Sequence, residues 1–149
     1  MFRDFLQIHN LTSRLHFRPA QGSDGRDGGR GSRYFIYDSS HVAKVASDVT
    51  FLLLRVLPGL KPRGLIHFHD IYYPFSSPVE WIREGLAWNE SIVLRAFLLG
   101  NRDFKIIAFN SFVGQALPEL FRDSCPSFLD NAGGSPWLRK IGESEVAAN

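Results

Sequence analysis

The sequence predicts an α/β fold in which helices pack against a largely parallel sheet. Short apolar segments of strand length alternate with segments whose apolar residues recur at helical spacing. Polar residues follow directly after two of these strands, in "YFIYD" (34–38) and "HFHD" (67–70). With 149 residues, 44% of them hydrophobic and 21% charged, the chain is long enough for one domain with its own core.

Residues 1–33 differ in composition from the rest of the chain. The stretch "QGSDGRDGGRGSR" (21–33) has no apolar side chain, so we expect this N-terminal segment to be flexible. Its glycines precede a strand, whereas the glycines of a dinucleotide-binding loop stand between a strand and a helix. A solvated segment is therefore expected here rather than a phosphate-binding loop.

Residues 34–70 read as strand, helix, strand. The aromatic run 34–38 predicts a buried strand, and Asp48 is the expected cap of the next helix. One face of that helix carries apolar residues at i, i+3, i+4 and i+7, namely Val49, Leu52, Leu53 and Val56. Pro58 and Gly59 end the helix, and "GLIHFHD" (64–70) predicts the second strand.

Two more helices and two more strands are expected beyond residue 76. "SPVE" (77–80) matches a capping box, and Asn89 can cap a second helix. The expected buried face of that second helix consists of Trp88, Ile92, Ala96 and Leu99. The apolar run 104–109 predicts a third strand and 135–141 a last one, with an irregular region over 114–134.

Charge and hydropathy exclude several classes of protein. The net charge is +2, from 17 basic and 15 acidic residues, which is too small to indicate binding to nucleic acid or to an anionic membrane. The longest apolar run, 51–54, is too short to span a bilayer, and the N-terminus lacks the apolar stretch of a signal peptide. We therefore expect a cytoplasmic protein without membrane contact. Cys125 is the one cysteine, so no intrachain disulfide can form.

Polar groups at the ends of two buried strands predict a site. In open α/β sheets the ligand crevice lies beyond the carboxyl ends of the strands. If the strands 34–38 and 64–70 are neighbours, Asp38, His69 and Asp70 converge there. Each acid has an alternative interpretation, as the cap of the turn that follows it. His67 lies deeper in its strand and is expected to be a packed core histidine.

The ordered blocks "YFIYDSSH", "LIHFHDIYYPF", "WNE" and "GGSPWLRK" resemble the C-terminal half of class I S-adenosylmethionine-dependent methyltransferases. The resemblance covers residues 34–141 and implies strands four to seven of a Rossmann-like sheet, mostly parallel with a late antiparallel strand. The family's glycine loop and cofactor half precede the fourth strand, and residues 1–33 do not resemble them. We therefore expect a truncated methyltransferase domain, a frayed tail over 142–149, and weak cofactor binding by this chain alone.

The resemblance implies roles for four residues near the two strand ends. Asp38 and Asp70 are the expected ligands of Mg²⁺ or another divalent cation that orients a substrate hydroxyl. His41 is the expected base, with Asp38 beside it in the catalytic group. Asp38 and Ser39 are also expected to contact S-adenosylmethionine. The alternative for His41 is a loop histidine bonded to the backbone.

Four further residues are candidates for binding the methyl acceptor. His69 can orient the acceptor, and Tyr72 and Tyr73 can form a wall of its pocket. Asn89, in the "WNE" block, can lie over the active site. The alternatives are aromatic packing under a loop for the tyrosines and a helix cap for Asn89.

The expected function is S-adenosylmethionine-dependent methylation of oxygen or nitrogen on a small molecule or sugar. One alternative is a non-catalytic remnant that associates with itself through the sheet edge left open before residue 34. Another is a nucleic-acid-binding protein that uses the Arg/Gly stretch, which the small net charge and the absence of aromatic residues in that stretch disfavour.

Overall fold

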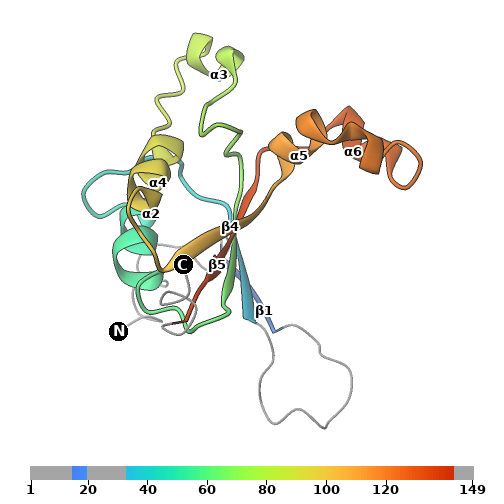
Figure 1. Ribbon diagram of the computed structural model, residues 1–149. Helices are drawn as coiled ribbons and strands as arrows, with labels where there is room; N and C mark the ends of the chain where they lie inside the picture. The colour runs from blue at the N-terminus through green and yellow to red at the C-terminus, as the bar shows by residue number, and fades with distance from the viewer. Residues whose placement is uncertain (1–14, 20–32, 143–149) are drawn as a thin grey trace, which may run out of the picture.

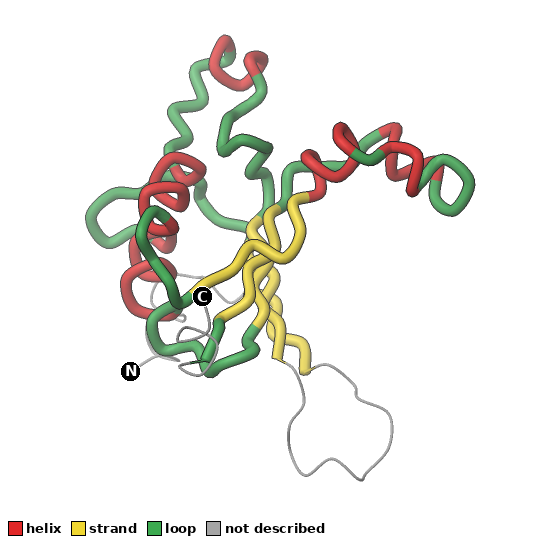
Figure 2. Tube along the Cα trace, viewed as in Figure 1, coloured by secondary structure: helices red, strands yellow, loops and turns green. Residues whose placement is uncertain are grey.

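The computed structural model describes residues 15–19 and 33–142, with side chains from residue 34 onward. Its strands form one sheet in the order β1-β2-β3-β5-β4 (Figures 1 and 2). The strands are β1 (Leu15–Pro19), β2 (Arg33–Tyr37), β3 (Leu65–Phe68), β4 (Phe104–Phe109) and β5 (Pro136–Lys140). The four strands expected between residues 34 and 141 are all present, and the α/β class is confirmed.

The prediction of a largely parallel sheet is wrong, because β2–β3 is the single parallel pair among the described strands. β5 lies between β3 and β4 and is antiparallel to both. β2, β3 and β4 still point the same way, since two antiparallel pairings separate β3 from β4. The expected late antiparallel strand is therefore β5. Because β5 lies between β3 and β4, these two strands do not form a second parallel pair.

β1 lies within the N-terminal segment in which no strand was predicted. It pairs antiparallel with β2, with Leu15 opposite Tyr37 and Pro19 opposite Arg33. The sheet edge expected to be open before residue 34 is therefore covered, and β1 and β4 are the edges of the described sheet. Residues 1–14, 20–32 and 143–149, including most of the expected flexible segment and the tail, lie outside the described residues.

The first helix packs on the sheet as predicted but starts differently. α2 (Asp48–Phe51) continues directly into the π-helical segment η2 (Leu52–Val56), and Val49, Leu52 and Leu53 are buried. The cap is Ser47 rather than Asp48, because the Ser47 hydroxyl accepts a 3.2 Å hydrogen bond from the backbone N–H of Thr50. The carboxylate of Asp48 instead accepts hydrogen bonds from Ser40 and from the backbone N–H of Val49.

The two later helices also depart from their predicted details. α3 (Val79–Arg83) has Pro78 at its N-cap and no side-chain cap hydrogen bond, so the predicted capping box is wrong. Asn89 stands at the N-cap of α4 (Glu90–Leu98) as predicted, but its side chain makes no cap hydrogen bond. The buried face of α4 is Glu90, Ser91 and Leu94. The face predicted around Ile92 and Leu99 is wrong, since these side chains are 65% and 73% exposed.

Residues 110–130 form helices where an irregular region was expected. α5 (Asn110–Ala116), η3 (Pro118–Leu120) and α6 (Pro126–Asp130) extend away from the sheet (Figure 1). The helices α2 and α4 lie on the side of the sheet away from α5 and α6 (Figure 1). Their buried side chains, including Val49 and Leu94, form one core cluster with Tyr37, Ile66 and Phe68 of the sheet. No helix in the described part of the chain is long and apolar enough to cross a membrane.

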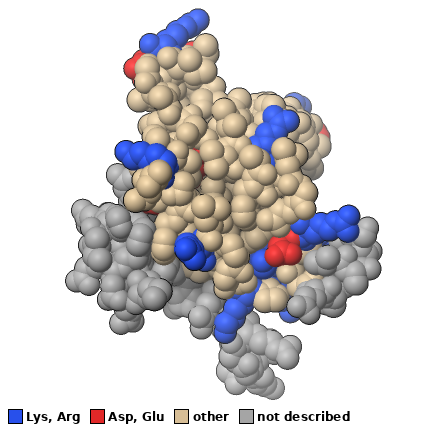
Figure 3. Space-filling view, turned by 90° about the vertical axis from the view of Figure 1, so that its left-hand side faces the viewer, with Lys and Arg blue, Asp and Glu red and all other residues tan. Residues whose placement is uncertain are grey.

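Charged side chains are sparse on one face of the molecule. Figure 3 shows Lys and Arg side chains spread over this face, with uncharged residues between most of them.

Candidate functional site

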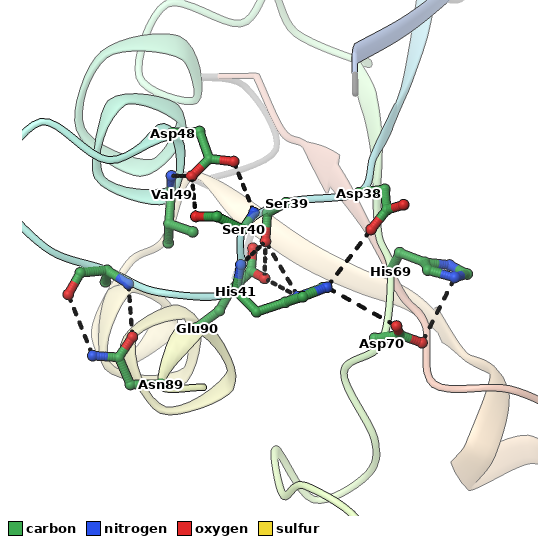
Figure 4. Close-up of polar contacts among 11 residues, drawn as sticks. Asp38, Ser39, Ser40, His41, Asp48, Val49, His69, Asp70, Asn89 and Glu90 are labelled. Atoms are coloured by element: carbon green, nitrogen blue, oxygen red, sulfur yellow. Dashed lines mark hydrogen bonds and ion pairs between the residues drawn. The ribbon is translucent and has the colours of Figure 1, made fainter. Parts of the chain in front are cut away.

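The loop after β2, residues 38–43, carries the first group of candidate residues and is anchored to α2 by Asp48 (Figure 4). The Asp48 carboxylate accepts a 2.8 Å hydrogen bond from the backbone N–H of Ser40 and a second, short one from the Ser40 hydroxyl. It also accepts from the backbone N–H of Val49 at 3.0 Å. Asp48 thus fixes the middle of the loop against the start of the helix.

The start of α4 holds the same loop from the other side. The side-chain amide of Asn89 accepts from the Ala43 N–H at 2.7 Å and donates to the Ala43 carbonyl at 3.3 Å. The backbone N–H groups of Asn89 and Glu90 donate to the His41 carbonyl at 3.0 and 3.2 Å. The side chain of Asn89, a candidate for acceptor binding, is therefore used to clamp the loop.

Glu90 is buried under this loop and binds two of its side chains. It is 2% exposed, and its Oε2 accepts a short hydrogen bond from the Ser39 hydroxyl. The same oxygen lies 2.9 Å from Nδ1 of His41. Trp88 stacks on the His41 ring at a centroid distance of 4.3 Å. All three residues of the "WNE" block therefore contact the loop.

The other side of the His41 ring faces two acids from adjacent strand ends. Nε2 lies 3.6 Å from Oδ1 of Asp38 and 4.0 Å from Oδ2 of Asp70 (Figure 4). Asp38 follows β2 and Asp70 follows β3, so the parallel pairing of these strands brings the two carboxylates to one imidazole. The Asp70 side chain is 29% exposed and that of Asp38 60%, which leaves both open to a ligand.

The charges around His41 alter its protonation. Burial, the largest influence, lowers the pKa of His41. The hydrogen bond and charge of Glu90, followed by the charges of Asp70 and Asp38, more than offset burial and raise the pKa above 6.5. With one nitrogen bound to the buried carboxylate of Glu90 and the other facing two partly exposed carboxylates, the ring can accept a proton at Nε2 and stabilise it.

The two histidines of "HFHD" differ in environment. His67 is buried against Trp137, and burial, followed by the charge of His69, lowers its pKa to about 4. The prediction of a packed core histidine is confirmed. His69 has a side chain that is 51% exposed, and its Nε2 lies 3.6 Å from Oδ1 of Asp70. His69 therefore lies beside Asp70 at the site, a position from which it could contact an acceptor.

The two tyrosines point in different directions from the strand tip. The Tyr72 ring packs edge-on against Trp81 and covers Gly134, where a Cβ would lie 2.5 Å from the ring. Burial, and to a lesser extent the charge of the nearby Asp70, raises the pKa of Tyr72. Tyr73 packs against Phe109 and Phe112 instead. Aromatic packing accounts for both rings, and Tyr72 is the one beside the site.

The expected cofactor and metal contacts have different support. The Ser39 hydroxyl donates to Glu90 and accepts from the His41 N–H at 2.8 Å, so it is occupied within the protein. In residues 33–142, no group of three or more His, Cys, Asp or Glu side chains is arranged to hold a metal ion. Mg²⁺ needs only one or two protein carboxylates beside its waters, and the carboxylate oxygens of Asp38 and Asp70 fit that requirement.

Glu90, Asp48 and Trp88 were not among the candidate site residues predicted from sequence. The signal that could have found Glu90 is its place in the "WNE" block, directly after the predicted cap Asn89.

Comparison with known proteins gave no match to a family model, to a curated protein or to a solved structure.

Proposed function

We propose that residues 33–142 form the acceptor-binding and base-bearing part of a class I S-adenosylmethionine-dependent methyltransferase. The reaction is methylation of oxygen or nitrogen on a small molecule or sugar. The observation that carries the proposal is the position of His41, whose Nε2 faces Asp38 at 3.6 Å and Asp70 at 4.0 Å while Nδ1 is held by Glu90.

The arrangement of the strands supports the proposal. The segments that the resemblance assigns to four consecutive strands are β2, β3, β4 and β5 of one sheet, and β5 is antiparallel to its neighbours. The "DSSH" and "HD" blocks follow the adjacent parallel strands β2 and β3. The Rossmann-like assignment of this sheet belongs to the proposal.

His41 acts as the base in the proposed reaction. Its Nε2 accepts the proton of the acceptor hydroxyl as the oxygen forms a bond to the methyl carbon and the bond from that carbon to sulfur breaks. When bound, S-adenosylmethionine would supply the electrophilic methyl group, with its thioether as the leaving group. The buried carboxylate of Glu90 stabilises the imidazolium that forms. Because only neutral His41 can accept the proton, activity rises as the pH passes its raised pKa.

A hard divalent cation fits beside this base. Asp38 and Asp70 would hold it, since both carboxylates face the same nitrogen and both remain partly exposed. When bound, the cation supplies charge that makes an acceptor hydroxyl more acidic. His69 and Tyr72, on either side of Asp70 in the sequence, are then the closest candidates to contact the acceptor.

A methyl-transfer assay tests the proposal. The chain is incubated with Mg²⁺, labelled S-adenosylmethionine at millimolar concentration and a panel of glycosides, catechols and amines. The high concentration is needed because the described residues include no strand–glycine loop–helix unit, so we expect weak cofactor binding. We expect slow transfer to at least one acceptor, reduced about 100-fold or more in His41→Ala, which is the usual effect of losing a general base.

The control is Asp123→Asn, which removes an exposed carboxylate far along the chain and should leave transfer unchanged. Failure to label any acceptor at saturating cofactor, or equal labelling by His41→Ala, would contradict the proposal. The first of these results would favour the non-catalytic alternative.

A further inference from the structure

Glu90 is an acid in a position where an acid is costly. It is 2% exposed at the start of α4, and a buried carboxylate is stable only when it is hydrogen-bonded or paired. Both of its partners bind one oxygen, Oε2, which accepts from the Ser39 hydroxyl and faces His41 Nδ1 at 2.9 Å. Oε1 is buried and has no hydrogen-bond partner among the described residues. The carboxylate is thus directed at the histidine and its neighbour alone.

The contact at 2.9 Å restricts where the imidazole can carry its hydrogen. An ionised carboxylate accepts hydrogen bonds and cannot donate them, so Nδ1 must bear a hydrogen to bind Oε2. A neutral imidazole has one N–H, which leaves a lone pair on Nε2. In the opposite tautomer, lone pairs on Nδ1 and Oε2 would face each other in a buried space.

Ser39 cannot take over this role. Its hydroxyl oxygen lies 3.2 Å from His41 Nδ1, but its hydrogen is directed at Glu90, and the oxygen accepts from the His41 backbone N–H at 2.8 Å. Of the two side chains near Nδ1, only Glu90 requires the hydrogen to be there.

The ring is also fixed in direction. The His41 backbone has a positive φ of 58°, which is uncommon outside glycine, and its carbonyl accepts from two N–H groups at the start of α4. Trp88 stacks on the ring. Nε2 therefore points toward Asp38 and Asp70, and a change of tautomer would turn the basic lone pair away from the acids.

We propose that Glu90 is a positioning residue that holds neutral His41 in the Nδ1–H tautomer, with the Nε2 lone pair directed at the space between Asp38 and Asp70. The catalytic meaning of this tautomer rests on the proposed function, in which His41 is the base. The tautomer itself is a property of the free protein. The three residues of the "WNE" block then act together on the histidine. Trp88 stacks on its ring, Asn89 holds its loop, and Glu90 binds its Nδ1.

Nitrogen-15 NMR of the histidine rings tests this inference on the full chain, without cofactor or acceptor. Spectra recorded above the pH at which His41 titrates distinguish Nδ1–H from Nε2–H, and His41→Gln identifies the signal. We expect Nδ1–H in the native protein and loss of that signal in favour of Nε2–H in Glu90→Met, which keeps the bulk but removes the acceptor. Ser39→Ala should retain Nδ1–H, and Glu84→Met, at an exposed site, serves as the substitution control.

An Nε2–H signal in the native protein would overturn the inference by itself, even if Glu90→Met did not fold. Retention of Nδ1–H in folded Glu90→Met, or its loss in Ser39→Ala, would also overturn it. None of these readouts requires methyl transfer, so a failure of this inference is distinct from a failure of the proposed function.

Discussion

Asn89 binds both backbone polar groups of Ala43 with its one side-chain amide, at 2.7 Å to the N–H and 3.3 Å to the carbonyl. The two residues are 46 positions apart in the sequence. This pair joins the loop after β2 to the start of α4 and thereby holds the candidate base between Asp38 and Asp70.

Asn89→Ala should destabilise the protein by about 1–3 kcal/mol, because two partly buried backbone groups lose their partner. Urea unfolding measures the change. The matched control is Asn101→Ala, whose side chain accepts one exposed hydrogen bond, from the Asp103 N–H at 2.9 Å, and should cost less than about 1 kcal/mol. Equal effects at the two positions would mean that the Asn89 clamp does not hold the loop.

Gly134→Ala should be destabilising, because its Cβ would lie 2.5 Å from Cε2 of Tyr72 and force the ring away. Overpacking of this kind costs about 1–3 kcal/mol. Gly59→Ala is the control, since the nearest atom to its Cβ would be 3.6 Å away. In Gly134→Ala combined with Tyr72→Ala most of the added cost should vanish. A double variant with purely additive losses would argue against contact between the two residues.

The stability of the fold should fall as the pH drops from 6.5 toward 4, because burial lowers the pKa of His67 to about 4. In that range the unfolded chain binds a proton at this residue and the native protein does not, so protonation favours unfolding. The expected loss is about 2 kcal/mol, discounted for partial solvent screening. His67→Phe should lose this part of the pH dependence, while His69→Asn should keep most of it, because burial is a larger cause of the lowered pKa than the charge of His69. Identical pH profiles for native protein and His67→Phe would contradict the expected pKa.

The strands were predictable because each is a short apolar run that ends at a polar residue or a turn. The run 104–109 coincides with β4, and 34–38 and 64–70 contain most of β2 and all of β3. Their pairing was less predictable, since β5 inserts between β3 and β4 only after the chain returns from residues 110–130. Nothing in the composition of β1 marks it as the partner of β2.

The missed role of Glu90 and the wrong face of α4 are one error. A helix turns by about 100° per residue, so the face centred on Ile92 places Glu90 about 200° away, toward solvent. The apolar pattern favoured that rotation. In the structure the helix is rotated the other way, so that Glu90 faces inward. There it contacts His41 and Ser39, which lie 49 and 51 residues earlier in the chain. No local pattern reports contacts at that separation, whereas the meeting of Asp38 and Asp70 follows from strand direction alone.

The titration of His41, followed by NMR in buffer with a chelator, tests the central claim most directly, namely that acids from three separate segments surround one imidazole. We predict a pKa above 6.5, lowered most by Glu90→Gln and less by Asp70→Asn and Asp38→Asn, with no change in Asp123→Asn. A His41 pKa at or below 6.5, unaffected by the three substitutions, would contradict the claim.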